Sequence, residues 1–93
     1  MITDVYIVDD DPMLREKFAK HEFTCKSNPF YHFYDIGSMI DRSAAFKLKG
    51  SFGAHQNPFA VVYDKDKAIK AFYSEAGDVY SDLINYLENY ENL

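Results

Sequence analysis

The stretch from Phe59 to Asp64, FAVVYD, is the sequence feature that most limits how this chain can fold. Nearly every residue in it is apolar, so it lacks the alternation of polar and apolar residues expected for a strand with one face in water. A short, continuous apolar run is typical of a central strand that is buried on both faces. The chain therefore needs further layers of structure on both sides of this strand.

Apolar spacing and turn residues predict the other elements around this central strand. Three segments rich in β-branched and aromatic residues predict strands: residues 3–8, 30–36 and 68–74. Three segments with helical spacing of apolar residues predict helices: residues 12–23, 39–50 and 78–90. The predicted order is β-α-β-α-β-β-α. It indicates one α/β domain over residues 1–93, with a four-stranded mixed sheet and helices on both faces.

The predicted second and third helices each have an apolar face that we expect to be buried. In the second helix we expect that face to contain Ala44, Ala45 and Leu48, with Gly50 and Gly53 ending the helix. The third helix should begin after Gly77 and Asp78. Its buried stripe should contain Val79, Leu83, Leu87 and Tyr90.

Composition excludes several classes of function. The formal net charge of −5 argues against a protein that binds nucleic-acid phosphates, because such binding depends largely on lysine and arginine. Cys25 is the single cysteine, so an intrachain disulfide is impossible. The first residues do not have the pattern of a signal peptide, and no apolar run approaches the length of a membrane span. We expect a soluble cytoplasmic protein of a bacterium or a virus, such as a phage.

Residues 52–67, FGAHQNPFAVVYDKDK, carry a resemblance to a known family. They contain the aromatic–glycine pair Phe52-Gly53, a short loop, Pro58, an apolar strand and a charged turn into the last strand. In this the chain resembles the thioredoxin-like family in its short, glutaredoxin-like form. The resemblance implies the strand order 2-1-3-4, with the first and last helices on one face and the second helix on the other. It also implies a cis bond between Asn57 and Pro58, beside the binding surface of the family.

The chain departs from this family at the redox motif, Cys-x-x-Cys, which the family carries between its first strand and first helix. The same junction here reads Asp10-Asp11-Pro12-Met13. Disulfide chemistry needs a thiolate, and neither a carboxylate nor a thioether can replace it. The resemblance therefore implies a redox-inactive protein that is not an enzyme. Cys25 is expected between the first helix and the second strand, away from the motif.

Asp9, Asp10 and Asp11 follow the first predicted strand directly. Asp11 is expected to cap the first helix, and Asp9 and Asp10 should be exposed near the positive end of its dipole. Residues 4–18 also resemble the start of a response-regulator receiver domain, in which neighbouring aspartates hold Mg²⁺. A degenerate, Mg²⁺-binding receiver-like domain therefore stays an alternative, although 93 residues are few for the five βα units of that family.

We expect this protein to be a protein-binding or regulatory module that needs no cofactor or metal. Its partner would be a protein or an extended peptide, and the chain itself a monomer or a weak homodimer. The resemblance places the binding surface on two segments: Asp10, Asp11, Pro12 and Met13, and His55, Gln56, Asn57 and Pro58. Two further alternatives are a single-thiol redox or glutathione-linked protein that uses Cys25, and an acidic inhibitor that mimics nucleic acid.

Basic residues gather in two places in the sequence, and together they could form a local basic face despite the net negative charge. We expect these side chains to be exposed and to contribute to solubility. They are Arg42, Lys47 and Lys49 in the second helix, and Lys65, Lys67 and Lys70 at the hairpin.

Overall fold

The computed structural model describes residues 1–11 and 29–90 of the chain. Its regular elements are β1 (Asp4–Asp9), β2 (Phe30–Asp35), α2 (Met39–Ser51), β3 (Phe59–Asp64), β4 (Lys67–Tyr73) and α3 (Val79–Asn89). A short 3-10 turn, Ser74–Ala76, connects β4 to α3. These elements confirm the four predicted strands and the last two predicted helices to within one residue at each end. The predicted helix over residues 12–23 lies outside the described residues.

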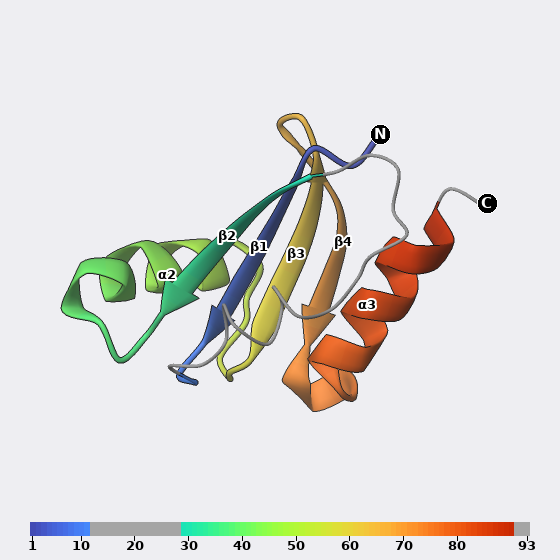
Figure 1. Cartoon of the computed structure of the whole chain (residues 1–93). Coiled ribbons are helices and arrows are strands. Elements are labelled where there is room, and N and C mark those ends of the chain that lie inside the picture. Colours follow the sequence, from blue (N-terminus) through green and yellow to red (C-terminus); the bar gives the residue numbers. More distant parts are fainter. Residues whose placement is uncertain (12–28, 91–93) are drawn as a thin grey trace.

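The four strands form one mixed sheet in the order β2-β1-β3-β4 (Figure 1). β1 pairs with β2 in parallel and with β3 in antiparallel, and β3 pairs with β4 in antiparallel. The protein is therefore α/β with the strand order that the sequence predicts. The two described helices lie on opposite sides of the sheet, as expected (Figure 1). No helix in residues 1–11 and 29–90 is long and apolar enough to cross a membrane.

The alternation of side chains along the central strands divides the buried residues into two groups. In β1, Val5 and Ile7 face α3, whereas Val8 faces α2. We call the group that packs against α3 the α3-side core. Its fully or almost fully buried members are Ile2, Val5, Ile7, Ala60, Val62, Phe72, Val79, Leu83 and Leu87.

The α2-side core lies on the other face of the sheet and is smaller. Its buried members are Val8, Ala45, Ala54, Phe59 and Val61. Because β3 contributes buried residues to both cores, the prediction of a central strand covered on both faces is confirmed. Full burial of a side chain as large as valine or phenylalanine contributes about 1.5–3 kcal/mol, so β3 is a major source of stability.

Helix α2 is rotated about its axis relative to the prediction. Ala45 is buried and Leu48 is half-buried, but Ala44 is exposed, so the prediction for Ala44 is wrong. The buried residue one turn after Ala45 is Lys49, which is only 4% exposed. Positions four apart lie on the same face of a helix, which explains why these two residues are buried together.

Helix α3 begins and packs as predicted. The Asp78 carboxylate accepts a hydrogen bond from the backbone N–H of Ser81 at 3.1 Å, as an N-cap residue does. Gly77, immediately before it, has φ of 150°, which a residue with a Cβ rarely adopts. The predicted stripe is confirmed for its three aliphatic residues, and Tyr90 is partly buried against the same core.

Candidate functional site

The antiparallel pairing of β1 and β3 places the described residues of the predicted binding surface at one end of the sheet. Val8 pairs with Phe59, so the residues after Val8 lie at the same end of the sheet as the residues before Phe59. We call this group the end-of-sheet surface: Asp10, Asp11, His55, Gln56, Asn57 and Pro58. The other two predicted members, Pro12 and Met13, lie outside the described residues.

The loop between α2 and β3 supplies four of these residues and is fixed at several points. The Tyr73 hydroxyl donates a hydrogen bond to the backbone oxygen of Phe52 at 3.1 Å. The backbone N–H of Ala54 donates to the backbone oxygen of Lys49 at 2.9 Å. The Lys49 ammonium donates to Asn57 Oδ1 at 2.7 Å. The loop is therefore held by the end of α2 on one side and by the end of β4 on the other.

The side chains of the loop differ in how far they reach into solvent. His55 and Gln56 are exposed, whereas Asn57 and Pro58 are half-buried. The Asn57–Pro58 peptide bond is cis, as the sequence analysis expects. Across the sheet end, Asp10 is exposed. The surface thus presents a carboxylate on one side and an imidazole and an amide on the other.

Asp9 corrects the sequence analysis, which places it among exposed residues at a helix start. It is instead the last residue of β1, and it is only 6% exposed. Its Oδ1 accepts a hydrogen bond from the backbone N–H of Asp10 at 2.6 Å. Burial raises the pKa of the Asp9 carboxyl, and the adjacent Asp10 carboxyl adds to this, while the backbone N–H groups of Asp10 and Asp11 oppose it. The Asp9 carboxyl therefore does not belong to the exposed part of the end-of-sheet surface.

The described residues do not gather ligands for a metal ion. In residues 1–11 and 29–90 no group of three or more His, Cys, Asp or Glu side chains could hold one. The capping role predicted for Asp11 depends on a helix outside these residues. Cys25, on which the single-thiol alternative depends, also lies outside them.

Lys49 is the residue beside the candidate site whose burial the sequence analysis predicts wrongly. The sequence predicts an exposed side chain, but Lys49 is buried. Its ammonium donates a hydrogen bond to the Asn57 side chain in the predicted binding loop. The sequence contains one indication that Lys49 is buried. Lys49 follows Ala45 by four residues, and Ala45 was expected on the buried face.

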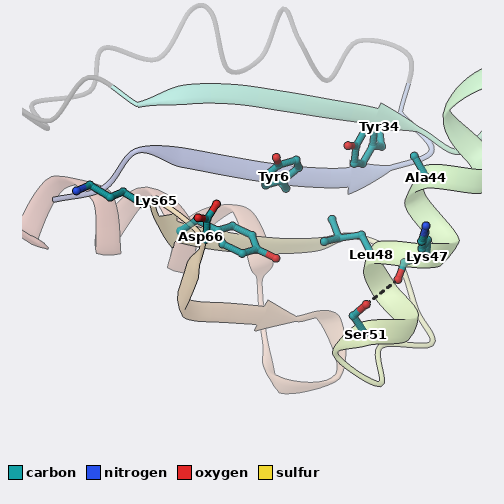
Figure 2. A pocket seen from close by; sticks show the side chains of 9 residues that line it. Tyr6, Tyr34, Ala44, Lys47, Leu48, Ser51, Lys65 and Asp66 are labelled. Carbon is teal, nitrogen blue, oxygen red and sulfur yellow. Dashed lines mark hydrogen bonds between the residues drawn. The ribbon is translucent and has the colours of Figure 1, made fainter.

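A hollow of about 420 Å³ lies on the α2 side of the sheet, away from the end-of-sheet residues (Figure 2). Figure 2 shows Tyr6 and Tyr34 on neighbouring strands, with Leu48 and Lys47 of α2 beside them. Tyr63 completes the aromatic wall, with its ring centroid 5.4 Å from that of Tyr6. We call this the tyrosine hollow. The sequence did not predict it, because its residues come from separate strands and from a helix.

The chemistry of the tyrosine hollow is that of hydrogen-bond donors. Burial raises the pKa of both Tyr6 and Tyr63, so their phenols remain protonated at neutral pH. Tyr6 also stacks on His32, with ring centroids 4.2 Å apart. His32 Nε2 lies 2.9 Å from Asp4 Oδ1, and this contact lowers the pKa of Asp4. The hollow is also lined by Lys47, Ser51, Lys65 and Asp66, so phenols, ammonium groups and a carboxylate are all available to orient a ligand.

Comparison of the chain with protein-family models, with curated proteins and with solved structures finds no match. The functional interpretation therefore depends on the residues and geometry described above.

Proposed function

We propose that this protein has a thioredoxin-like fold without the paired thiols of that family, and that it acts as a binding module for another protein. The order and directions of the strands agree with what the resemblance implies. So does the position of α2 and α3 on opposite faces. Asp10 and Met13 stand where the family has its thiols, so we propose no catalytic role.

The observation that carries the proposal is the fixed loop beside the end of β1. Three hydrogen bonds connect the loop and the residues next to it to α2 and β4, while His55 and Gln56 remain exposed. A loop that is already ordered loses little conformational entropy when a partner binds to it. This favours recognition of a partner over a purely structural connection between α2 and β3.

The chemistry of the surface indicates what the partner presents. The exposed Asp10 carboxylate selects a partner with a basic group, because charge complementarity mainly determines specificity and the rate of association. The exposed loop beside it can accept an extended segment through backbone and side-chain contacts. We propose that the partner is a polypeptide with an extended, partly basic segment.

The proposal is tested by affinity capture from a lysate of the organism that makes the protein. The bait is the tagged protein, compared with the double variant Asp10→Lys and Gln56→Arg. Both residues are exposed, so the substitutions should leave the fold intact. The control is Asp82→Lys with Asn89→Arg, which makes the same change in charge at two exposed positions outside the tyrosine hollow and the Lys49 hollow. Urea unfolding of each bait checks that all three are folded.

We expect the first double variant to lose a partner that both wild type and the control retain. A partner retained by all three baits would move the binding site away from the end-of-sheet surface. Loss by both variants would indicate attraction by overall charge alone. If folded wild-type bait captures nothing specific, the proposed function is wrong.

A further inference from the structure

Lys49 is a buried cation at the edge of the proposed binding surface. It lies in the last turn of α2 and is 4% exposed. Its ammonium has three N–H donors, and one of them bonds to Asn57 Oδ1 at 2.7 Å. The acceptor is a neutral amide, so this contact satisfies a donor but does not balance the charge.

The described residues provide no opposite charge for this lysine. In residues 1–11 and 29–90 the ion pairs join the Met1 ammonium to Asp64 and His32 to Asp4. The carbonyl oxygens at the end of α2 would attract a cation, but those of Lys49 and Gly50 already accept backbone hydrogen bonds from the following loop. Burial of an unbalanced charge is unfavourable, and an anion that binds beside it offsets part of that cost.

A hollow of about 270 Å³ lies at this lysine, and we call it the Lys49 hollow. Its walls are mostly small or apolar: Phe46, Gly50, Gly53, Ala54 and His55 line it together with Lys49. The Lys49 ammonium lies 5.7 Å from the centroid of the Phe46 ring, and that ring is part of a side chain that is 60% exposed. The hollow thus combines a buried positive charge with an apolar wall that continues to the surface.

We propose that the Lys49 hollow binds a carboxylate, supplied by an aspartate or glutamate side chain of the partner polypeptide. This inference rests on the proposed function, because His55 belongs both to the hollow and to the end-of-sheet surface. The small, largely apolar hollow favours a compact anion on an aliphatic stem, whose methylene groups contact Phe46. The partner segment therefore carries an acidic side chain for Lys49 and a basic one for Asp10.

The direct test uses small probes rather than the unidentified partner. N-acetylglutamate N-methylamide carries the carboxylate, and N-acetylglutamine N-methylamide is its neutral counterpart. Each is titrated into the isotopically labelled protein at constant ionic strength, and the backbone amide resonances are followed. We expect the glutamate probe to give saturable shifts at Gly50, Gly53, Ala54 and His55. The glutamine probe should give none that saturate.

Three variants separate the hollow from general charge effects. Lys49→Met should abolish the shifts, whereas Lys47→Met, at an exposed lysine of the same helix, should leave them unchanged. Gly50→Leu retains the lysine and introduces a side chain into the hollow. Apart from its chain neighbours and the backbone of its own helix, a Cβ added at Gly50 would meet no atom within 4 Å, so this exposed position should accept a side chain. The variant should also abolish the shifts, and it serves as the test if Lys49→Met does not fold.

Equal responses to the two probes, or equal loss in both lysine variants, would overturn the inference. Binding of inorganic phosphate without binding of the glutamate probe would also overturn the carboxylate assignment. The outcome is separable from that of the proposed function. A partner found at the end-of-sheet surface without glutamate binding would contradict only the carboxylate site. Glutamate binding at the hollow without any protein partner would support the site and contradict the proposed function.

Discussion

The two faces of the sheet differ in how completely a helix covers them. Helix α3 contributes Val79, Leu83 and Leu87 to the α3-side core, and all three are almost inaccessible to solvent. Helix α2 contributes one fully buried apolar residue, Ala45, to the α2-side core. Its other residue of comparable burial is Lys49, a cation.

Hollows lie on both sides of the described sheet. One of about 320 Å³ is lined by residues of β4 and α3, among them Phe72 and Tyr86. The tyrosine hollow and the Lys49 hollow are both lined in part by α2. A helix that buries little apolar area leaves space beside it, and that space can be lined by phenols, lysines and glycines. The α3 side therefore contributes more buried aliphatic side chains to the fold, whereas the tyrosine hollow and the Lys49 hollow lie beside the helix that buries fewer of them.

The largest expected effect comes from truncating a leucine on each side. Leu83 is fully buried in the α3-side core, whereas Leu48 of α2 is half-buried. Leu83→Ala should destabilise the protein by about 2–5 kcal/mol, because it removes buried methyl groups and leaves a cavity. Leu48→Ala should cost less than half as much. Urea unfolding of both variants measures the difference, and equal losses would contradict the division between the two faces.

A smaller effect separates the beginnings of the two helices. The Asp78 side chain caps α3, whereas the side chain of Ser38, the N-cap residue of α2, makes no capping hydrogen bond. Asp78→Ala should therefore cost about 1 kcal/mol, a typical value for loss of a capping side chain. Ser38→Ala should leave the free energy of unfolding nearly unchanged. A larger loss at Ser38 than at Asp78 would show that α2 depends on a contact that the described geometry lacks.

The sequence predicts the α3 side more accurately than the α2 side, for physical reasons. The apolar run of β3 and the regular stripe of α3 are local patterns, and each gives the correct element and the correct buried face. In α2 the spacing of the apolar residues is compatible with more than one rotation of the helix about its axis. The sequence therefore predicts that Ala44 is buried and Lys49 exposed, whereas the structure shows the opposite. The family resemblance predicts that Asp10 and the loop before β3 lie at the same end of the sheet, and the pairing of Val8 with Phe59 places them there. The tyrosine hollow depends on the pairing of strands far apart in the sequence, which no local pattern specifies.

The smallest expected effect concerns the buried carboxyl at the end of β1. Because burial raises the pKa of Asp9, the native state holds this proton at pH values where the unfolded chain has lost it. The contribution of this group to stability is therefore greatest in acid, and it is lost as pH rises through the native pKa. Asp9→Asn retains an oxygen for the backbone N–H of Asp10 and removes the charge. It should raise the melting temperature by a few degrees at pH 7.

This gain should shrink toward zero as pH falls to the ordinary range of an aspartate, because the carboxyl is then neutral in both states. Thermal unfolding across that pH range measures the trend, with Asp66→Asn at an exposed position as the matched control. The control should show no comparable gain. A lower melting temperature for Asp9→Asn at pH 7 would mean that the backbone N–H groups of Asp10 and Asp11 stabilise the carboxylate more than burial destabilises it. In that case Asp9 would serve to order the residues around Asp10, and its charge would support the end-of-sheet surface directly.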